Sequence, residues 1–118
     1  MITSETLLEQ TVLAADDKRA EDIMALDVRG ISLLADYFVI CHGNSEKQVA
    51  AIASEIVSKA HEAGVEIGRV EGKDKGKWVL IDLGDVIVHV FHGEERDFYN
   101  LEKLWSDAPL VDITEWVA

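Results

Sequence analysis

The most constraining feature of this sequence is a pair of apolar segments, 78–83 and 86–91, separated only by Gly84 and Asp85. Each segment is rich in β-branched and aromatic residues, and a Gly-Asp pair between two such runs is typical of a two-residue hairpin turn. A turn of that length fixes the register, so Leu83 is expected opposite Val86 and Trp78 opposite Phe91. The sequence therefore predicts an antiparallel hairpin in one register.

This register gives the hairpin two chemically different faces. One face carries only aliphatic side chains, as a helix-covered core requires: Val79, Ile81, Leu83, Val86, Val88 and Val90. The other face mixes large apolar residues with a carboxylate and an imidazole: Trp78, Leu80, Asp82, Ile87, His89 and Phe91. Apolar anchors beside a few polar groups are typical of a protein-binding surface. A second layer that covers this face, with Asp82 paired to His89, would explain the same residues, so both interpretations stay open.

The remaining segments predict helices and further strands around the hairpin. Helical spacing of apolar residues marks 4–17, the stretch from Ser45 to Ala63, and 94–105. Ser45 and Gln48 have the spacing of a capping box, and Gly64 suits the left-handed end of that helix. Strands are predicted at 23–28, 37–41 and 65–70. This order predicts an α/β domain with a mixed five-stranded sheet and packed helices over residues 1–118, with 109–118 as a C-terminal tail.

Charge separates the classes of partner. The chain has 11 Lys and Arg against 23 Asp and Glu, a net charge of −12. Proteins that bind a nucleic-acid phosphate backbone are expected to be basic, so the net negative charge argues against an extensive nucleic-acid-binding surface. Acidic charge can simply maintain solubility, or it can steer the chain toward a basic protein partner.

The sequence also predicts a compartment. Cys41 is the single cysteine, so no internal disulfide is expected. The first residues lack the pattern of a signal peptide, and no apolar run approaches the about 20 residues of a membrane span. A cytoplasmic protein without membrane contact is the expectation.

Several residues could support chemistry, and each has a structural explanation as well. The Gly-Asn-Ser turn at 43–45 lies between a strand and a helix and could bind an anion, although helix capping accounts for its serine. Asp82 and Asp85 could hold Mg²⁺, or could be plain edge and turn residues. His89 and His92 point to opposite faces of a strand and no Cys cluster accompanies them. Neither a metal site nor a cofactor is predicted.

Longer motifs resemble a known family. The chain reads GKWVLIDLGDVIVHVF at 76–91 and RDFYNLEKLWSDA at 96–108, and it resembles the Iojap family of ribosomal silencing factors there. DIMALDV at 22–28 and DYFVICHGNS at 36–45 match earlier family segments in the same order. The resemblance covers residues 5–108. It implies a nucleotidyltransferase-like fold that lacks the catalytic carboxylates of those enzymes.

The resemblance further implies a translation repressor that is not an enzyme. It would bind a basic protein on the intersubunit face of the large ribosomal subunit, with little or no direct nucleic-acid contact, and block joining of the small subunit when nutrients are scarce. Family members are commonly homodimers in isolation, so the mixed face could serve the ribosome, the dimer or both. The candidate partner-binding residues are Trp78, Leu80, Asp82, Asp85, His89, Phe91, Arg96 and Tyr99. The alternative is a nucleotidyltransferase-like enzyme that uses the Gly-Asn-Ser turn with Asp82 or Asp85.

Overall fold

One mixed sheet organises the chain in the computed structural model, which describes residues 2–73, 76–100, 103 and 105–117, without the side chains of 97–99. Its strands are β1 (Glu21–Asp27), β2 (Tyr37–Gly43), β3 (Arg69–Glu71), β4 (Trp78–Asp82) and β5 (Val86–His92), in the order β1-β2-β5-β4-β3. β2 and β5 pair in parallel, and the other neighbours pair antiparallel. The predicted mixed five-stranded sheet is confirmed.

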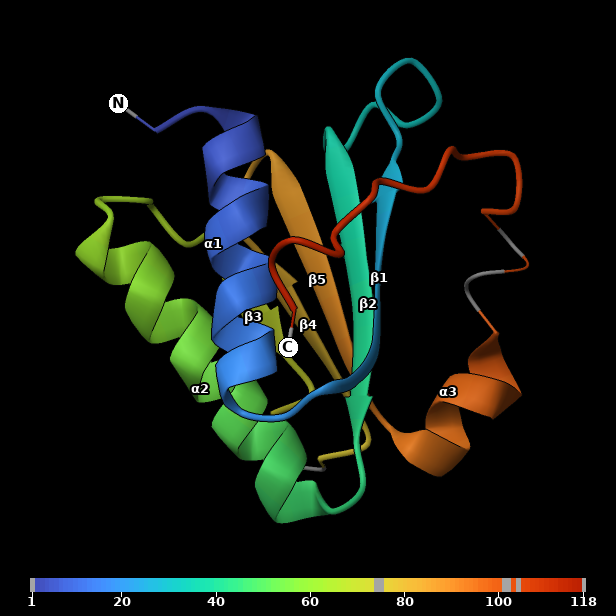
Figure 1. Cartoon of the computed structure of the whole chain (residues 1–118). Coiled ribbons are helices and arrows are strands. Elements are labelled where there is room, and N and C mark those ends of the chain that lie inside the picture. Colours follow the sequence, from blue (N-terminus) through green and yellow to red (C-terminus); the bar gives the residue numbers. More distant parts are fainter. Residues whose placement is uncertain (1, 74–75, 101–102, 104, 118) are drawn as a thin grey trace.

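The helices of the described residues lie on both sides of this sheet. They are α1 (Ser4–Asp17), α2 (Glu46–Glu62) and α3 (Gly93–Tyr99). α1 and α2 lie side by side over one face, and α3 lies on the opposite side (Figure 1). We call the face under α1 and α2 the inner face and the opposite one the outer face.

The hairpin forms in the predicted register. Trp78 pairs with Phe91, Leu80 with His89 and Asp82 with Ile87. The backbone N–H of Leu83 donates to the carbonyl oxygen of Val86 across 2.9 Å, which closes the two-residue turn. Gly84 has a φ of +86°, a conformation that residues with a Cβ rarely adopt.

The inner face forms the main core, as the aliphatic alternation predicts. Val79, Ile81, Val88 and Val90 are fully buried, and the central strand β2 adds Val39 and Cys41. The helices complete it with one apolar stripe each: Leu8, Val12, Val49, Ile52 and Ile56. Strands and helices with matched apolar faces make this layer closely packed.

α2 begins and ends where the sequence predicts. The Ser45 side chain accepts a hydrogen bond from the backbone N–H of Gln48. At the other end, the N–H of Val65 donates to the Ala60 carbonyl and Gly64 has a φ of +81°, which is a Schellman ending. The second half of the capping box differs from the prediction, since Gln48 Oε1 accepts from the N–H of Asn44 and not from Ser45.

Two predicted boundaries differ from the structure by more than two residues. β3 starts at Arg69 and not at residue 65. Arg69 pairs with Asp82, the last residue of β4, so residues 65–68 have no β4 residues beside them to pair with. The N–H of Gly68 still donates to the Asp82 carbonyl. α3 ends at Tyr99 and not at residue 105, because Asn100 adopts a left-handed φ of +47°. Leu101 and Leu104, which were expected on this helix, lie outside the described residues.

The C-terminal segment follows the free edge of β1. Leu110 forms an antiparallel bridge with Leu26, and the N–H of Val111 donates to the Ala25 carbonyl. Ile113 and Trp116 then pack against the inner core. Among the described residues, no helix has both the length and the apolar character needed to cross a membrane.

Candidate functional site

The outer face divides into a covered half and a half that stays partly exposed to solvent. Its buried cluster lies over β1, β2 and β5 and comprises Leu26, Val28, Ala35, Phe38, Ile40, Ile87, Phe91 and Ala108. Trp78 and Leu80 on β4, Met24 on β1 and Trp105 are only partly buried around it. The two interpretations of this face therefore each apply to part of it.

The covered half takes two of the predicted site residues into the core. Trp105 stands edge-on to Phe38 with ring centroids 5.0 Å apart, and Phe91 is fully buried. His89 retains only 8% of its exposure, and burial lowers its pKa to about 4, so the ring is neutral. His89 is therefore too deeply buried for its side chain to contact a large partner.

The polar groups of this face are paired differently from the expected Asp82–His89 contact. The Trp78 indole Nε1 donates to His89 Nδ1 across 3.1 Å, so the acceptor nitrogen of the buried imidazole has a partner. Asp82 Oδ1 instead accepts from the backbone N–H of Gly84 at 2.9 Å and so stabilises the turn. The Trp78 ring also stacks on Phe91 with centroids 5.1 Å apart.

The partly exposed half of the outer face is the outer side of β4 and the turn that follows it. Trp78, Leu80 and Asp82 are all half-buried, and Asp85 at the turn is exposed. We call these four residues the β4 surface. Large apolar side chains that remain partly exposed beside carboxylates suit contact with a protein that is both apolar and basic.

Sequence reasoning missed a group of exposed apolar residues in the loop between β1 and β2. Leu33 is completely exposed, Leu34 is 73% exposed and Ile31 is 47% exposed; we call these three the loop patch. The N–H groups of Asp36 and Tyr37 both donate to the Asp85 carbonyl, so this loop and the hairpin turn meet at one end of the sheet. The available signal was the run Ile-Ser-Leu-Leu after Gly30, which has neither strand nor helix spacing.

The base of that loop is held by an ion pair. Arg29 bonds to both carboxylate oxygens of Asp27, at 2.7 and 3.0 Å, and lies over the Tyr37 ring. The hydrogen bonds from Arg29 lower the pKa of Asp27. This contact fixes where the loop leaves the sheet.

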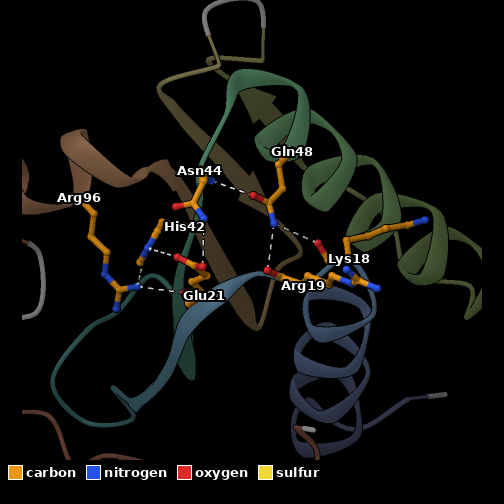
Figure 2. A network of polar contacts seen from close by, with 7 residues as sticks. All are labelled: Lys18, Arg19, Glu21, His42, Asn44, Gln48 and Arg96. Atoms are coloured by element: carbon orange, nitrogen blue, oxygen red, sulfur yellow. Dashed lines mark hydrogen bonds and ion pairs between the residues drawn. The ribbon is translucent and has the colours of Figure 1, made fainter.

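Arg96 lies inside the molecule, and Figure 2 shows its contacts. Its Nη1 contacts His42 Nδ1 at 2.9 Å and donates to the Glu21 carbonyl at 3.3 Å, while His42 Nε2 lies 3.1 Å from Glu21 Oε2. A guanidinium can only donate, so His42 Nδ1 accepts and its Nε2 carries the proton toward Glu21. Arg96 thus attaches α3 to β1 and β2. The Tyr99 side chain lies outside what the structure describes.

The Gly-Asn-Ser turn belongs to the same network (Figure 2). Asn44 Nδ2 donates to Glu21 Oε1 at 3.0 Å, and its backbone N–H donates to Gln48 Oε1 at 2.8 Å. Gln48 Nε2 continues to the carbonyl of Arg19 at 2.9 Å. The N–H groups of Asn44 and Gln48 at this helix start are thus engaged with side chains of the protein itself, which favours the structural explanation of the turn.

Two features of the described structure bear on possible chemistry, the thiol of Cys41 and the grouping of potential metal ligands. Cys41 is completely buried, and burial raises the pKa of its thiol to about 12, so it is not a reactive thiolate. Among the described residues, no three His, Cys, Asp or Glu side chains are grouped as a metal site would require.

Comparison with known proteins agrees with the motifs. The family model described as "Ribosomal silencing factor during starvation" matches residues 1–118. Ribosomal silencing factor RsfS of Bacillus subtilis is 61% identical over 112 residues, 95% of this chain and 95% of that protein. A crystal structure from Bacillus halodurans, 59% identical, superposes with a TM-score of 0.83 over 92% of this chain and 98% of that one. A more distant mouse relative, "Mitochondrial assembly of ribosomal large subunit protein 1", is 29% identical over 84% of this chain and 45% of its own length. The chain belongs to the ribosomal silencing factor family, and the suspected resemblance is confirmed.

Proposed function

We propose that this member of the ribosomal silencing factor family represses translation by docking on a basic protein at the intersubunit face of the large ribosomal subunit. The bound domain then occupies space that the small subunit needs, so joining is blocked without any bond being made or broken. The name of the mouse relative connects that protein to the large subunit, and the family description connects silencing to starvation. A role on the ribosome makes the cytoplasm the proposed compartment.

The observation that carries the proposal is the combination of uncovered apolar residues and carboxylates along β4 and at the turn and loop beyond its end. Trp78 and Leu80 are partly exposed on β4, and the loop patch is exposed beside the turn that carries Asp85. Clustered apolar anchors supply binding energy, while carboxylates at the rim select a basic partner and reject an acidic one. A net charge of −12 disfavours docking through RNA.

The direct test is a ribosome-binding assay with a charged substitution on the β4 surface. Purified protein is mixed with large subunits and pelleted through sucrose, and small subunits are then added to score joining. We expect stoichiometric pelleting and blocked joining, both reduced by about tenfold or more in Trp78→Glu, because a hot-spot aromatic is lost. Absence of binding to large subunits by the unaltered protein would contradict the whole proposal.

Two further variants locate the contact. Leu33→Glu combined with Leu34→Glu alters the loop patch, which is exposed, so the fold should remain intact by circular dichroism. Leu13→Glu is the matched control, because Leu13 is 45% exposed on the helical layer on the other side of the sheet. Binding lost in the loop variant but kept in the control would place the contact at the loop end. Equal loss in both would show that neither surface is specific.

A homodimer through the same surface would compete with the ribosome. We propose that the free protein self-associates through the β4 surface and that this dimer must open before docking. Sedimentation velocity on the Trp78→Glu variant is expected to show a monomer, while Leu13→Glu remains dimeric. A dimer that persists in Trp78→Glu would show that the dimer contact does not depend on the residue proposed for the ribosome contact.

A further inference from the structure

The contact between Trp78 and His89 joins the two halves of the outer face. In the hairpin register Leu80 lies opposite His89 and Trp78 lies opposite Phe91, so Trp78 and His89 are diagonal neighbours on one face. Their ring centroids are 5.9 Å apart, and the indole Nε1 lies 3.1 Å from the imidazole Nδ1. A partly exposed residue of the β4 surface is thus bonded to a buried residue of β5.

The direction of this hydrogen bond follows from the chemistry of the two rings. An indole N–H can only donate, so Nδ1 of His89 accepts and the neutral imidazole carries its proton on Nε2. Burial lowers the pKa of His89 to about 4, so the ring is uncharged at neutral pH and keeps this acceptor. The single donor of the Trp78 side chain is therefore used within the domain.

Neighbouring rings hold the imidazole in place. Phe38 on β2 stands edge-on to His89 with centroids 5.8 Å apart, and Phe91 lies 6.3 Å away at an interplanar angle of 15°. Phe91 also stacks on Trp78, with centroids 5.1 Å apart. The acceptor that Trp78 uses is thus fixed by buried side chains of two strands, and this supporting layer restricts the orientation of the indole.

An imidazole is an unexpected side chain at this buried position. The other outer-face residues of β5 are Ile87 and Phe91, and both are apolar and buried. Burying a polar ring costs free energy, and an apolar side chain at position 89 would avoid that cost. An apolar side chain would supply no acceptor for the indole N–H, so the contact with Trp78 accounts for the imidazole.

We propose that His89 is a positioning residue, which holds the Trp78 indole in the orientation that docks on the large subunit. The inference rests on the proposed function and defines the contact more closely. Because the indole N–H is directed to His89, Trp78 presents apolar ring surface, and the partner needs an apolar site without an acceptor for that N–H. An indole fixed before docking loses less conformational freedom on binding, which corresponds to about threefold to tenfold in affinity.

Two variants of His89 test this role through the affinity for isolated large subunits. His89→Gln keeps an acceptor for the indole, whereas His89→Leu keeps the bulk of the side chain without one. We expect His89→Leu to weaken binding by about threefold to tenfold and His89→Gln by less than about twofold. Urea unfolding is the control, because His89→Leu should be at least as stable as His89→Gln. Equal affinities of the two variants would overturn the proposal.

A double-mutant cycle tests whether His89 acts through Trp78. Trp78→Phe removes the N–H donor but keeps an aromatic ring, so in this background His89→Leu should change the affinity by less than about twofold. The same loss in both backgrounds would overturn the proposal, since His89 would then act on the docking surface independently of the indole.

The free protein gives a readout that needs no ribosome. The indole N–H resonance of Trp78, assigned with Trp78→Phe, should be protected from exchange with water in the unaltered protein and in His89→Gln. It should lose that protection in His89→Leu, and unchanged exchange there would overturn the positioning role while binding by the unaltered protein persists. Absence of binding to large subunits by the unaltered protein is a different outcome, which would contradict the proposed function and with it the docking role of His89.

Discussion

The two faces of the sheet are built by different means, although the same strands supply both. The inner face is apolar and mostly aliphatic, and α1 and α2 lie over it (Figure 1). Over β1, β2 and β5 the outer face packs with Trp105 and Ala108, while Trp78 and Leu80 on β4 remain half-buried. The inner face is a core, and the outer face is a core on one side and a surface on the other.

This difference shows how one sheet can provide stability and recognition together. The inner layer supplies most of the apolar burial, so β4 can leave large side chains partly exposed without unfolding the domain. Substitutions on the two faces should therefore have effects on different properties.

The largest expected effect is on folding and comes from the inner face. Ile81→Ala removes a fully buried side chain and should lower the free energy of unfolding by about 2–5 kcal/mol. Its neighbour Leu80 points to the other face and is half-buried, so Leu80→Ala should lower it by only about 1 kcal/mol. Urea unfolding at neutral pH measures both. If the two variants lost equal stability, the outer side of β4 would be as much a core as the inner side.

The next effect concerns His89, the titrating group in the covered half. Burial lowers its pKa to about 4 in the folded state, against 6.5 for a free imidazole. Below pH 6.5 the unfolded chain binds a proton that the folded chain does not, so stability falls until the pH reaches about 4, by about 3 kcal/mol in total.

His89→Gln separates this effect from the titration of the carboxylates. Glutamine can still accept from the Trp78 indole, but it does not titrate in this range. Urea unfolding is measured at about pH 7, 5 and 4, which span the interval between the unfolded and folded pKa values of His89. As the pH falls, the unaltered protein should lose stability more steeply than the variant. Parallel profiles would mean that His89 is accessible enough to be protonated in the folded state.

The elements with strong local signals could be predicted from the sequence. The Gly84-Asp85 turn fixed the register of β4 and β5, and Ser45 and Gly64 marked the limits of α2. In each case the decisive physics is local, since a turn conformation or a cap depends on residues close in sequence.

The division of the outer face could not be predicted in this way. Whether Phe91 or Trp78 is covered depends on where residues 105–110 return to the sheet, and the strand pattern carries no information about that. The burial of Arg96 likewise depends on His42 and Glu21, which lie far away in sequence. The loop patch was missed because an exposed apolar loop has no periodicity, and its exposure becomes visible only in the folded chain.

The smallest expected effect concerns how α3 is attached beside the outer face. α1 and α2 are held by apolar packing, whereas α3 is tied to β1 and β2 by Arg96, which is 8% exposed and contacts His42 and the Glu21 carbonyl. Arg96→Met retains the length of the side chain but removes these donors, and it should lower stability by about 1–2 kcal/mol. Hydrogen exchange should accelerate in residues 93–99 before it changes in α2, because local opening follows the weakest attachment. Arg96→Lys is the matched control, since it keeps the charge but not the planar set of donors, and an intermediate effect is expected. Equal acceleration of α2 and α3 amides would show that the two sides of the sheet open as one unit, and the contrast between an apolar inner attachment and a polar outer one would not hold.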